Sequence, residues 1–214
     1  MNRATRLSRA FFDRPTVQVA RELLGARLVR VENGRRLAGI IVETEAYCGE
    51  EDLGCHAKSG RTRRNEALYG PPGHAYVYFT YGMHWLFNCV TRPEGEPEAV
   101  LIRAIEPTEG LNEIQARRDG QPRRLWADGP AKLTRALGID GRHNHLDLTA
   151  KDATIFLEEG IRIPKRLFTV SPRVGLYTVP EPWKSKPWRF LAKLPEDVIV
   201  GARSNLRFGR LAPT

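Results

Sequence analysis

Cysteine is scarce in this chain, and its spacing fits neither a disulfide framework nor a common metal site. The 214 residues include three cysteines, Cys48, Cys55 and Cys89, with no Cys-x-x-Cys pair among them. An odd number without such pairs argues against structural disulfides. A zinc site made from Cys48, Cys55 and His56 would have unusual spacing and no fourth ligand. We therefore expect free thiols, no metal and no cofactor.

Long apolar runs are also missing. No stretch approaches the roughly 18 consecutive apolar residues of a membrane-spanning helix. Arg3, Arg6 and Arg9 are not followed by the apolar core of a secretory signal. The sequence thus predicts a cytoplasmic protein with no membrane partner, associated with the nucleoid if bacterial and nuclear if eukaryotic.

Positive charge is what the chain has in excess. Its 34 lysines and arginines against 25 acidic residues give a net charge of +9. Such a surface favours polyanions, chiefly DNA, RNA or an anionic membrane, although a generally basic proteome would have the same composition. The arginines are spread from Arg3 to Arg210 rather than gathered in one tail. This spread favours a folded face that follows phosphates over a disordered arm.

The length favours a single domain, 1–214, with one substantial core. Apolar periodicity, turn residues and helix caps divide the chain into short elements. The predicted helices are a segment from Asp13-Arg14-Pro15 to Gly25, then Leu111–Arg118 and Lys132–Leu137. The predicted strands are 26–31, 37–47, 75–90 with a break at Tyr81-Gly82, 99–105, 154–157, 173–177 and 187–191, with a long loop over 49–73. The pattern predicts an α+β fold: a curved, mainly antiparallel, open-barrel-like sheet with flanking helices and a protruding β-hairpin.

Two glutamates lie on the second predicted strand. Strand alternation places Glu43, Glu45 and Tyr47 on one face, where glutamates repel each other unless something uses them. For Glu43 the simpler interpretation is an ion pair with nearby arginines. For Glu45, beside Tyr47, we favour a functional role, because a partly buried carboxylate can take a proton from a water that attacks a glycosidic carbon.

Tyrosines cluster around these glutamates. Tyr47, Tyr76, Tyr78 and Tyr81 fall within a short span, and stacking on an aromatic ring contributes roughly 1–3 kcal/mol per nucleobase. That is comparable to the few kcal/mol that extruding a base from a duplex costs. Core packing is the commoner fate of any one tyrosine. Taken together, the residues predict a pocket for a nucleobase pulled out of DNA.

At these residues the chain resembles the alkyladenine DNA glycosylases, the mammalian type of DNA-3-methyladenine glycosylase. The resemblance follows the chain in order over nearly its whole length. Its segments are Phe11-Phe12-Asp13, 41–49, 76–88, Leu101-Ile102-Arg103-Ala104-Ile105-Glu106-Pro107, Gly129-Pro130-x-Lys132-Leu133, Arg173-Val174-Gly175 and Lys186-Pro187-Trp188-Arg189-Phe190.

The resemblance implies three residues around the attacking water. Glu45 would be the general base that positions and deprotonates it. Arg103 and the backbone carbonyl of Val174 would help to hold it.

The resemblance also implies residues for the base and for the DNA. Tyr47 and His56 would sandwich the flipped base against Tyr78, and His56 would offer a hydrogen bond at the edge of the base. Asn88 would crowd the position of the exocyclic amine of guanine. On the DNA side, Tyr81 at the hairpin tip, with Met83 beside it, would fill the gap left in the minor groove. Lys132 would contact a phosphate.

The implied activity is monofunctional hydrolysis of the N-glycosidic bond in base excision repair. The partner is double-stranded DNA that contains damaged purines, namely 3-methyladenine and 7-methylguanine, and the protein is expected to be a monomer. Apart from Lys58, no lysine lies near the motif, so strand cleavage by an amine is not expected. Hypoxanthine is the weaker expectation, because a neutral base must be protonated as it leaves and no acid is evident.

Strand parity adds one expectation to the resemblance, which implies that Tyr78 and Asn88 point into the same pocket. A two-residue turn at Tyr81-Gly82 would place Asn88 on the face opposite Tyr78. A three-residue loop would pair Tyr78 with Leu86 and Tyr76 with Asn88. We predict the odd loop, or an equivalent bulge.

Two other function classes explain part of the pattern. A non-catalytic binder of damaged DNA would keep the pocket but has no use for Glu45 close to phosphates. An α+β RNA-binding module explains the charge and the aromatics, and leaves Glu45 and Arg103 without a purpose. The motif His143-Asn144-His145 resembles a nuclease fragment only superficially and is interpreted as a turn.

Overall fold

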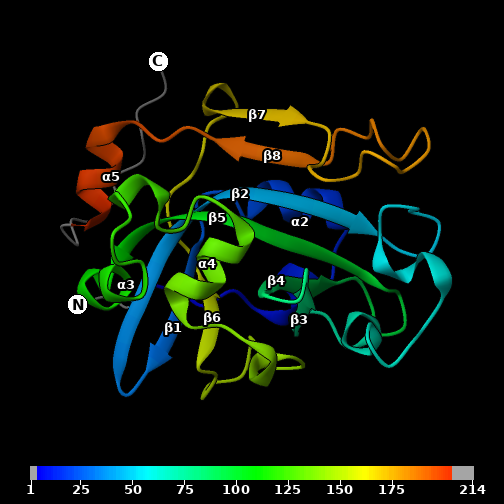
Figure 1. Cartoon of the computed structure of the whole chain (residues 1–214), viewed down its shortest axis with the longest axis horizontal. Helices are drawn as coiled ribbons and strands as arrows, with labels where there is room; N and C mark the ends of the chain where they lie inside the picture. The colour runs from blue at the N-terminus through cyan, green and yellow to red at the C-terminus, as the bar shows by residue number, and fades with distance from the viewer. Residues whose placement is uncertain (1–3, 204–214) are drawn as a thin grey trace.

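A two-residue turn begins the sheet. Asn33 and Gly34 have φ values of 49° and 74°, the backbone of a hairpin turn whose twist matches that of the strands it joins. The turn connects β1 (Arg27–Glu32) to β2 (Arg35–Cys48). In this computed structural model, which describes residues 4–203, β2 is the longest strand (Figure 1).

All eight strands in the described part of the chain belong to one antiparallel sheet, which does not close into a barrel. Six strands follow the order β3-β4-β5-β2-β1-β6, and β8 pairs with both β2 and β7. The bounds of the other strands are β3 (Ala75–Thr80), β4 (His84–Thr91), β5 (Glu98–Glu109), β6 (Ile155–Glu158), β7 (Phe168–Ser171) and β8 (Arg189–Ala192). Strand β2 pairs with β5 along most of its length, with β1 over its first half and with β8 over residues 43–45. The centre of β2 is therefore surrounded by other strands.

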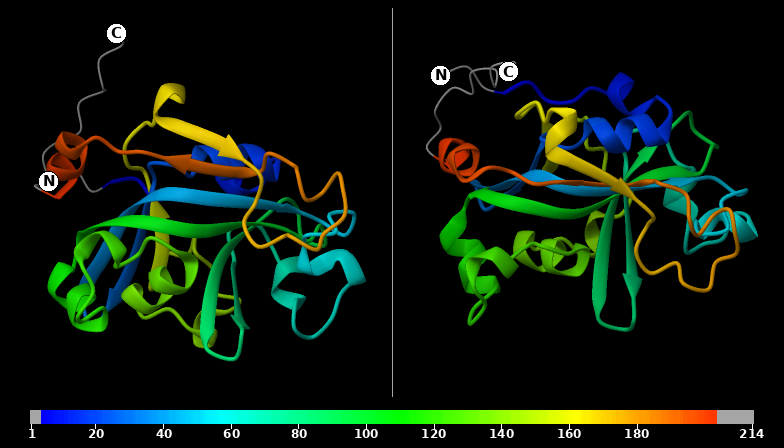
Figure 2. Two further views of the ribbon diagram at one scale, coloured as in Figure 1. Left: turned by 45° about the horizontal axis from the view of Figure 1, so that its top comes forward. Right: turned by 90° about the horizontal axis from the view of Figure 1, so that it is seen from above.

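Helices cover both faces of the sheet. The bounds are α1 (Arg9–Phe12), α2 (Thr16–Glu22), α3 (Leu111–Arg117), α4 (Pro130–Leu137) and α5 (Glu196–Arg203). Helix α2 packs on one face of β2 and β5, and α3 and α4 lie on the other (Figures 1 and 2). Helix α4 begins with Pro130 and ends at Gly138, which has the left-handed φ of 65° that suits glycine after a helix.

The hairpin β3–β4 projects away from the sheet (Figure 2). Thr80 pairs with His84, so Tyr81, Gly82 and Met83 form a three-residue loop, and Tyr78 pairs with Leu86. Tyr76 pairs with Asn88. The predicted odd loop is confirmed.

Two long connections lie at the same end of the sheet. Residues 49–73 and 172–188 appear side by side in Figure 1 and in the left view of Figure 2. The first contains two short 3₁₀ turns, His56–Ser59 and Glu66–Tyr69. The predicted loop over 49–73 is thus largely confirmed.

The predicted α+β fold is confirmed, and the helices and most of the strands fall where the sequence placed them. The predicted strand over 173–177 is wrong, because this segment is a turn in which Gly175 has φ +83°. The neighbouring N–H of Val174 donates to a side chain rather than to a strand. The strand of this region is β7, which was not predicted; nor were α1 and α5.

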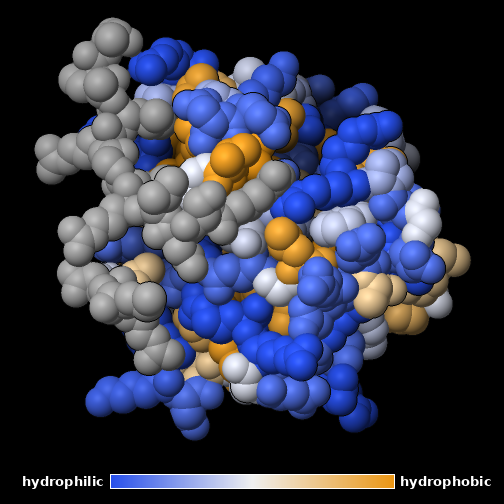
Figure 3. All heavy atoms as spheres, turned by 90° about the vertical axis from the view of Figure 1, so that its left-hand side faces the viewer, coloured by the Kyte–Doolittle hydropathy of each residue, from blue (hydrophilic) through white to orange (hydrophobic). Residues whose placement is uncertain are grey.

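The end of the molecule that carries α3 and α5 shows mainly hydrophilic side chains with scattered apolar ones (Figure 3). Arg3 and Arg210, the ends of the arginine spread, and the two ends of the predicted domain lie outside the described residues. Between residues 4 and 203, no helix has the length and apolar character needed to cross a membrane.

Candidate active site

A cavity of about 320 Å³ opens where β2, the β3–β4 hairpin and the 172–188 segment meet. This size is within the range of small-molecule sites. Its lining combines aromatic, amide and guanidinium side chains with backbone. The lining residues used below are Tyr47, His56, Tyr76, Tyr78, Tyr81, Asn88, Arg103, Pro130 and Val174.

Glu45 lies directly behind the lining of this cavity, in contact with three of its lining residues. Its side chain has no exposed surface. The backbone N–H of Val174 donates to Glu45 Oε1 at 2.7 Å. The Tyr47 hydroxyl donates to Oε2 at 2.9 Å, and Arg103 Nη1 donates to the same oxygen at 3.3 Å. Tyr47, Arg103 and Val174, three lining residues, therefore separate this carboxylate from the cavity.

Arg103 lies at a β-bulge between β2 and β5, which directs its side chain towards Glu45. Glu43 pairs with Ala104 and Thr44 pairs with Ile102, so Arg103 has no partner in the register. Bulges of this kind redirect a side chain and are frequent next to active sites. Thr44, on the other face of β2, donates its hydroxyl to the Ala20 carbonyl of α2.

The predicted ion pair of Glu43 is confirmed. Glu43 Oε1 accepts from Arg103 Nε at 2.8 Å and from Arg189 Nε at 2.6 Å. Glu43 and Glu45 both bind Arg103, so the guanidinium stands between two carboxylates that would otherwise repel each other.

Burial raises the pKa of the Glu45 carboxyl above its ordinary value of 4.5. Arg103, the Val174 N–H and the Tyr47 hydroxyl act in the opposite direction, because each stabilises the ionised form. The net result is a carboxyl group with a raised proton affinity. Such a group can accept a proton from water.

The aromatic wall is held together by one hydrogen bond. The Tyr76 hydroxyl and His56 Nδ1 are 2.8 Å apart, and the His56 ring meets the Tyr78 ring edge-on with centroids 4.5 Å apart. His56 is exposed at the cavity mouth, yet packing by its neighbours lowers its pKa, and Arg64 and Lys58 act in the same direction. At 4.5 Å no base fits between His56 and Tyr78, so these two rings form one wall of the cavity.

Asn88 is buried and is held by the hairpin itself. Its side-chain amide Nδ2 donates to the Tyr76 carbonyl across the β3–β4 pair at 3.0 Å. The side chain lines the cavity together with Tyr78. The predicted pocket residues Tyr47, Tyr78 and Asn88 are therefore brought together in one cavity.

Comparison with known proteins assigns the chain to one family. The family model described as methylpurine-DNA glycosylase matches residues 10–195. The chain belongs to the methylpurine-DNA glycosylase family.

Three relatives illustrate how much of the chain this similarity covers. A protein of Carboxydothermus hydrogenoformans is 46% identical over 187 residues, covering 87% of this chain and 95% of that protein. One of Myxococcus xanthus is 43% identical over 195 residues (91% and 94%), and one of the archaeon Methanocella arvoryzae is 46% identical over 188 residues (87% and 92%). Each carries the name "Putative 3-methyladenine DNA glycosylase".

The residues that the family resemblance assigned to DNA lie on the cavity side of the molecule. Tyr81 and Met83 at the hairpin tip expose 86% and 68% of their surface, and Tyr81 also borders the cavity. Lys132 lies in the first turn of α4, two residues after the lining residue Pro130, and its ammonium group pairs with Asp128 at 2.9 Å.

Sequence reasoning gave no role to Tyr76 beyond a possible stacking ring, and none to Asp52 or Arg173. Tyr76 holds His56 by its hydroxyl. Asp52 and Arg173 form an ion pair with no exposed side-chain surface, directly behind Tyr47. Arg173 belonged to a recognised motif, but nothing local in the sequence joins it to Asp52, 121 residues away.

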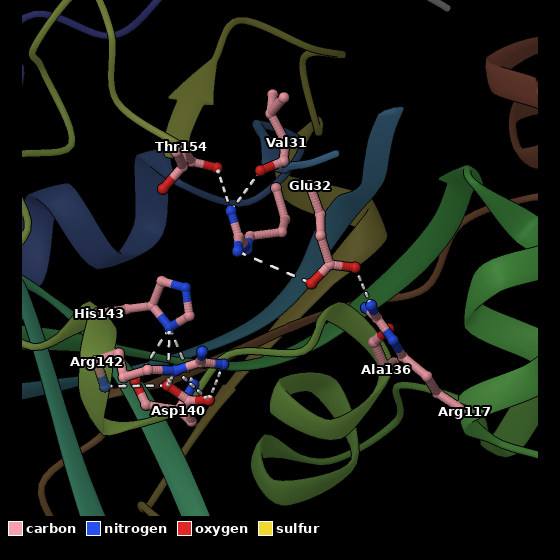
Figure 4. Close-up of polar contacts among 9 residues, drawn as sticks. Val31, Glu32, Arg117, Ala136, Asp140, Arg142, His143 and Thr154 are labelled. Atoms are coloured by element: carbon pink, nitrogen blue, oxygen red, sulfur yellow. Dashed lines mark hydrogen bonds and ion pairs between the residues drawn. The ribbon is translucent and has the colours of Figure 1, made fainter. Parts of the chain in front are cut away.

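The histidine motif and the cysteines take structural roles. Figure 4 shows His143 directed at Asp140, where its Nδ1 accepts the Asp140 backbone N–H at 3.1 Å. Cys48, Cys55 and Cys89 are free, as expected. Burial raises the pKa of the Cys55 thiol to about 11, and the pKa of the other two thiols also rises on burial, so all three are unreactive.

Proposed function

We propose that this protein is a monofunctional DNA glycosylase that extrudes alkylated purines from duplex DNA and hydrolyses their N-glycosidic bonds, as a step of base excision repair. The observation that carries the proposal is the carboxylate of Glu45, buried behind the lining of an aromatic cavity and held by the lining residues Val174, Tyr47 and Arg103. Family membership supports the same conclusion.

Glu45 acts as the general base in this proposal. The longest of its three contacts is the 3.3 Å one from Arg103. In this proposal the attacking water lies beside the Arg103–Glu45 contact, where it accepts a hydrogen bond from Arg103 and donates one to Glu45. The carboxylate takes the proton of the water and offsets the positive charge that develops on the sugar.

The extruded base stacks between Tyr47 and the His56–Tyr78 wall. The edge-on contact between these two rings favours this arrangement, because at a centroid distance of 4.5 Å it leaves no room for a base between them. Asn88, fixed by the Tyr76 carbonyl, stands where the exocyclic amine of guanine would lie and so disfavours the normal base. Alkylated purines are cations in DNA, and aromatic rings attract cations through their π faces.

The hairpin tip enters the minor groove. Tyr81 fills the gap left by the extruded nucleotide, Met83 contacts its neighbours and Lys132 binds a phosphate. The exposure of the two tip side chains and the net charge of +9 support this placement. We propose 3-methyladenine and 7-methylguanine as substrates, hypoxanthine as a weaker one, and a monomer as the active species.

The test is base release from methylated duplex DNA under single-turnover conditions. Glu45→Gln should slow release by about 100-fold or more while DNA binding persists. Glu98→Gln is the matched control, because burial also raises the pKa of Glu98, whose carboxylate binds Thr16 away from the cavity. Equal release by wild type and Glu45→Gln would refute the assigned mechanism. Binding without release by wild type would identify a damage binder instead.

A further inference from the structure

Behind Tyr47 lies an ion pair that the proposed reaction does not use. Arg173 Nη1 and Nη2 donate to the two oxygens of Asp52 at 2.5 and 2.8 Å, and neither side chain has exposed surface. Arg173 Nη1 also donates to the Ala46 carbonyl at 3.0 Å. Asp52 accepts the backbone N–H groups of Cys48 and Gly54. Arg173 thus ties the 172–188 segment to β2, and Asp52 supplies its counter-charge.

The guanidinium covers the back of the ring that faces the base. The central carbon of the Arg173 guanidinium is 4.7 Å from the centroid of the Tyr47 ring and 5.0 Å from that of Trp188. Tyr47 lines the cavity, whereas Arg173 and Asp52 do not. Arg173 therefore lies on the side of Tyr47 turned away from the cavity. A purine stacked on the cavity side would lie roughly 8 Å from this guanidinium.

Each of the guanidinium groups packed around Tyr47 and Glu45 has a carboxylate partner. Arg103 and Arg189 are bound by Glu43, and Arg103 also by Glu45. Arg173 is bound by Asp52. Burial lowers the pKa of His56, a basic group of the cavity wall, and so disfavours its charged form. The positive charges directly behind Tyr47 and beside Glu45 are therefore each compensated by a carboxylate.

This balance matters for a cationic base. Two unit charges about 8 Å apart, at the effective dielectric constant of about 20 that suits protein sites, interact strongly enough to change affinity by roughly tenfold or more. An unpaired Arg173 would oppose the attraction between a cationic purine and the face of Tyr47. We propose that Asp52 is a specificity-determining residue, which neutralises Arg173 behind Tyr47 and so lets the pocket prefer cationic alkylpurines over neutral purines of the same shape. The inference rests on the proposed function.

The experiment compares two nucleotides that differ in charge alone. Short duplexes carry either 7-methylguanine, a cation, or 7-methyl-7-deazaguanine, its neutral isostere, each on a 2′-fluorinated sugar that slows bond cleavage. The measured quantity is the ratio of their dissociation constants at fixed salt. Wild type should bind the cation more tightly than the isostere. A wild-type ratio of one, or a preference for the isostere, would overturn the inference without any variant.

The variants locate the effect in the ion pair. Asp52→Asn should lower the preference for the cation by about tenfold, which corresponds to about 1.4 kcal/mol. Arg173→Gln, which removes the cation and keeps the Asp52 carboxyl, should raise it. The double variant should return it to near the wild-type value. A structural role alone would weaken both duplexes equally in every variant, and that result would refute the proposal.

Folding and function are kept apart in this design. If Asp52→Asn fails to fold, Arg173→Gln and the double variant decide the question, because the first should raise the preference and the second should leave it near the wild-type value; the wild-type ratio stands by itself. Failure of wild type to release 7-methylguanine from ordinary methylated DNA would refute the proposed function. An unchanged charge preference in the folded variants, with normal release, would refute only the role of Asp52.

Discussion

The floor of the cavity and the tip of the hairpin contrast in how their side chains are held. At the floor, Glu43 and Glu45 are almost fully buried. Glu43 Oε1 and both carboxylate oxygens of Glu45 accept hydrogen bonds from within the protein. At the tip, Tyr81 and Met83 expose most of their surface. Between the two lies the wall of Tyr76 and Tyr78, on the same hairpin as the tip.

The difference shows which interactions stabilise each region: contacts within the protein at the floor, and contacts with DNA at the tip. The floor is ordered by contacts that exist before DNA arrives, so a change there should alter stability and the chemical step. The exposed tip gains its contacts from a partner, so a change there should alter DNA affinity and leave stability nearly unchanged. Four predictions test this division.

The largest effect is expected from Glu43→Ala. The substitution leaves Arg103 and Arg189 without their shared carboxylate, and breaking a buried ion pair costs about 3–5 kcal/mol. Urea denaturation should therefore show a loss of about 3 kcal/mol in the free energy of unfolding. Glu113→Ala, which removes an exposed pair with Arg35, is the control and should change the free energy of unfolding far less. Similar losses in both variants would contradict the contrast.

Tyr81→Ala should weaken binding to duplexes that contain a methylated purine by about tenfold or more, because the stacking ring is lost. Its free energy of unfolding should stay within about 0.5 kcal/mol of wild type, since the side chain is exposed. Fluorescence anisotropy measures the first quantity and urea denaturation the second. Tyr81→Phe keeps the ring and should bind like wild type. A large loss of stability in Tyr81→Ala would show that the tip is part of the core.

The rate of base release should fall on the acid side at a pH above the ordinary carboxyl value. Glu45 must be ionised to accept a proton, and burial raises its pKa above 4.5. Release should therefore drop by about tenfold per pH unit once the pH falls below this raised pKa. Protonation of His56, whose pKa is lowered from 6.5, adds to the loss by placing a cation beside the base. Single-turnover rates of base release, measured across a range of pH, show this decrease on the acid side.

Tyr81→Ala is the control for this pH profile. Its rate of base release should fall over the same pH range as that of wild type, although its affinity for DNA is lower. A rate that stays constant down to pH 4.5 would exclude Glu45 as the titrating base.

The smallest effect is expected from Tyr76→Phe, which removes the hydroxyl that binds His56. One such hydrogen bond contributes about 1 kcal/mol, so base release should slow by roughly fivefold with little change in DNA affinity. The Phe variant keeps the ring and its packing against Tyr78. A loss of affinity without a loss of rate would place Tyr76 in DNA binding rather than in the pocket wall.

Much of the fold could be predicted because its signals are local. The turn at Asn33-Gly34, the cap at Gly138 and the alternation along β2 each depend on residues close in sequence. Strand parity, combined with the requirement of the family resemblance that Tyr78 and Asn88 share one pocket, gave the three-residue loop and the pairing of Tyr76 with Asn88. The strand expected at 173–177 was wrong because its backbone donates to Glu45, a partner 129 residues away.

By itself the sequence determined the residue types of the site, the family and the order of the elements. The first two follow from the sequence motifs, and the third follows from the periodicity of apolar residues along the chain. Only the tertiary structure decided the contacts of Glu45 and the bulge that directs Arg103 towards it. It also decided the pairing of Asp52 with Arg173 behind Tyr47. The physical reason is that burial and ion pairing depend on groups brought together by packing, and strand period carries no information about which distant charge will neutralise which.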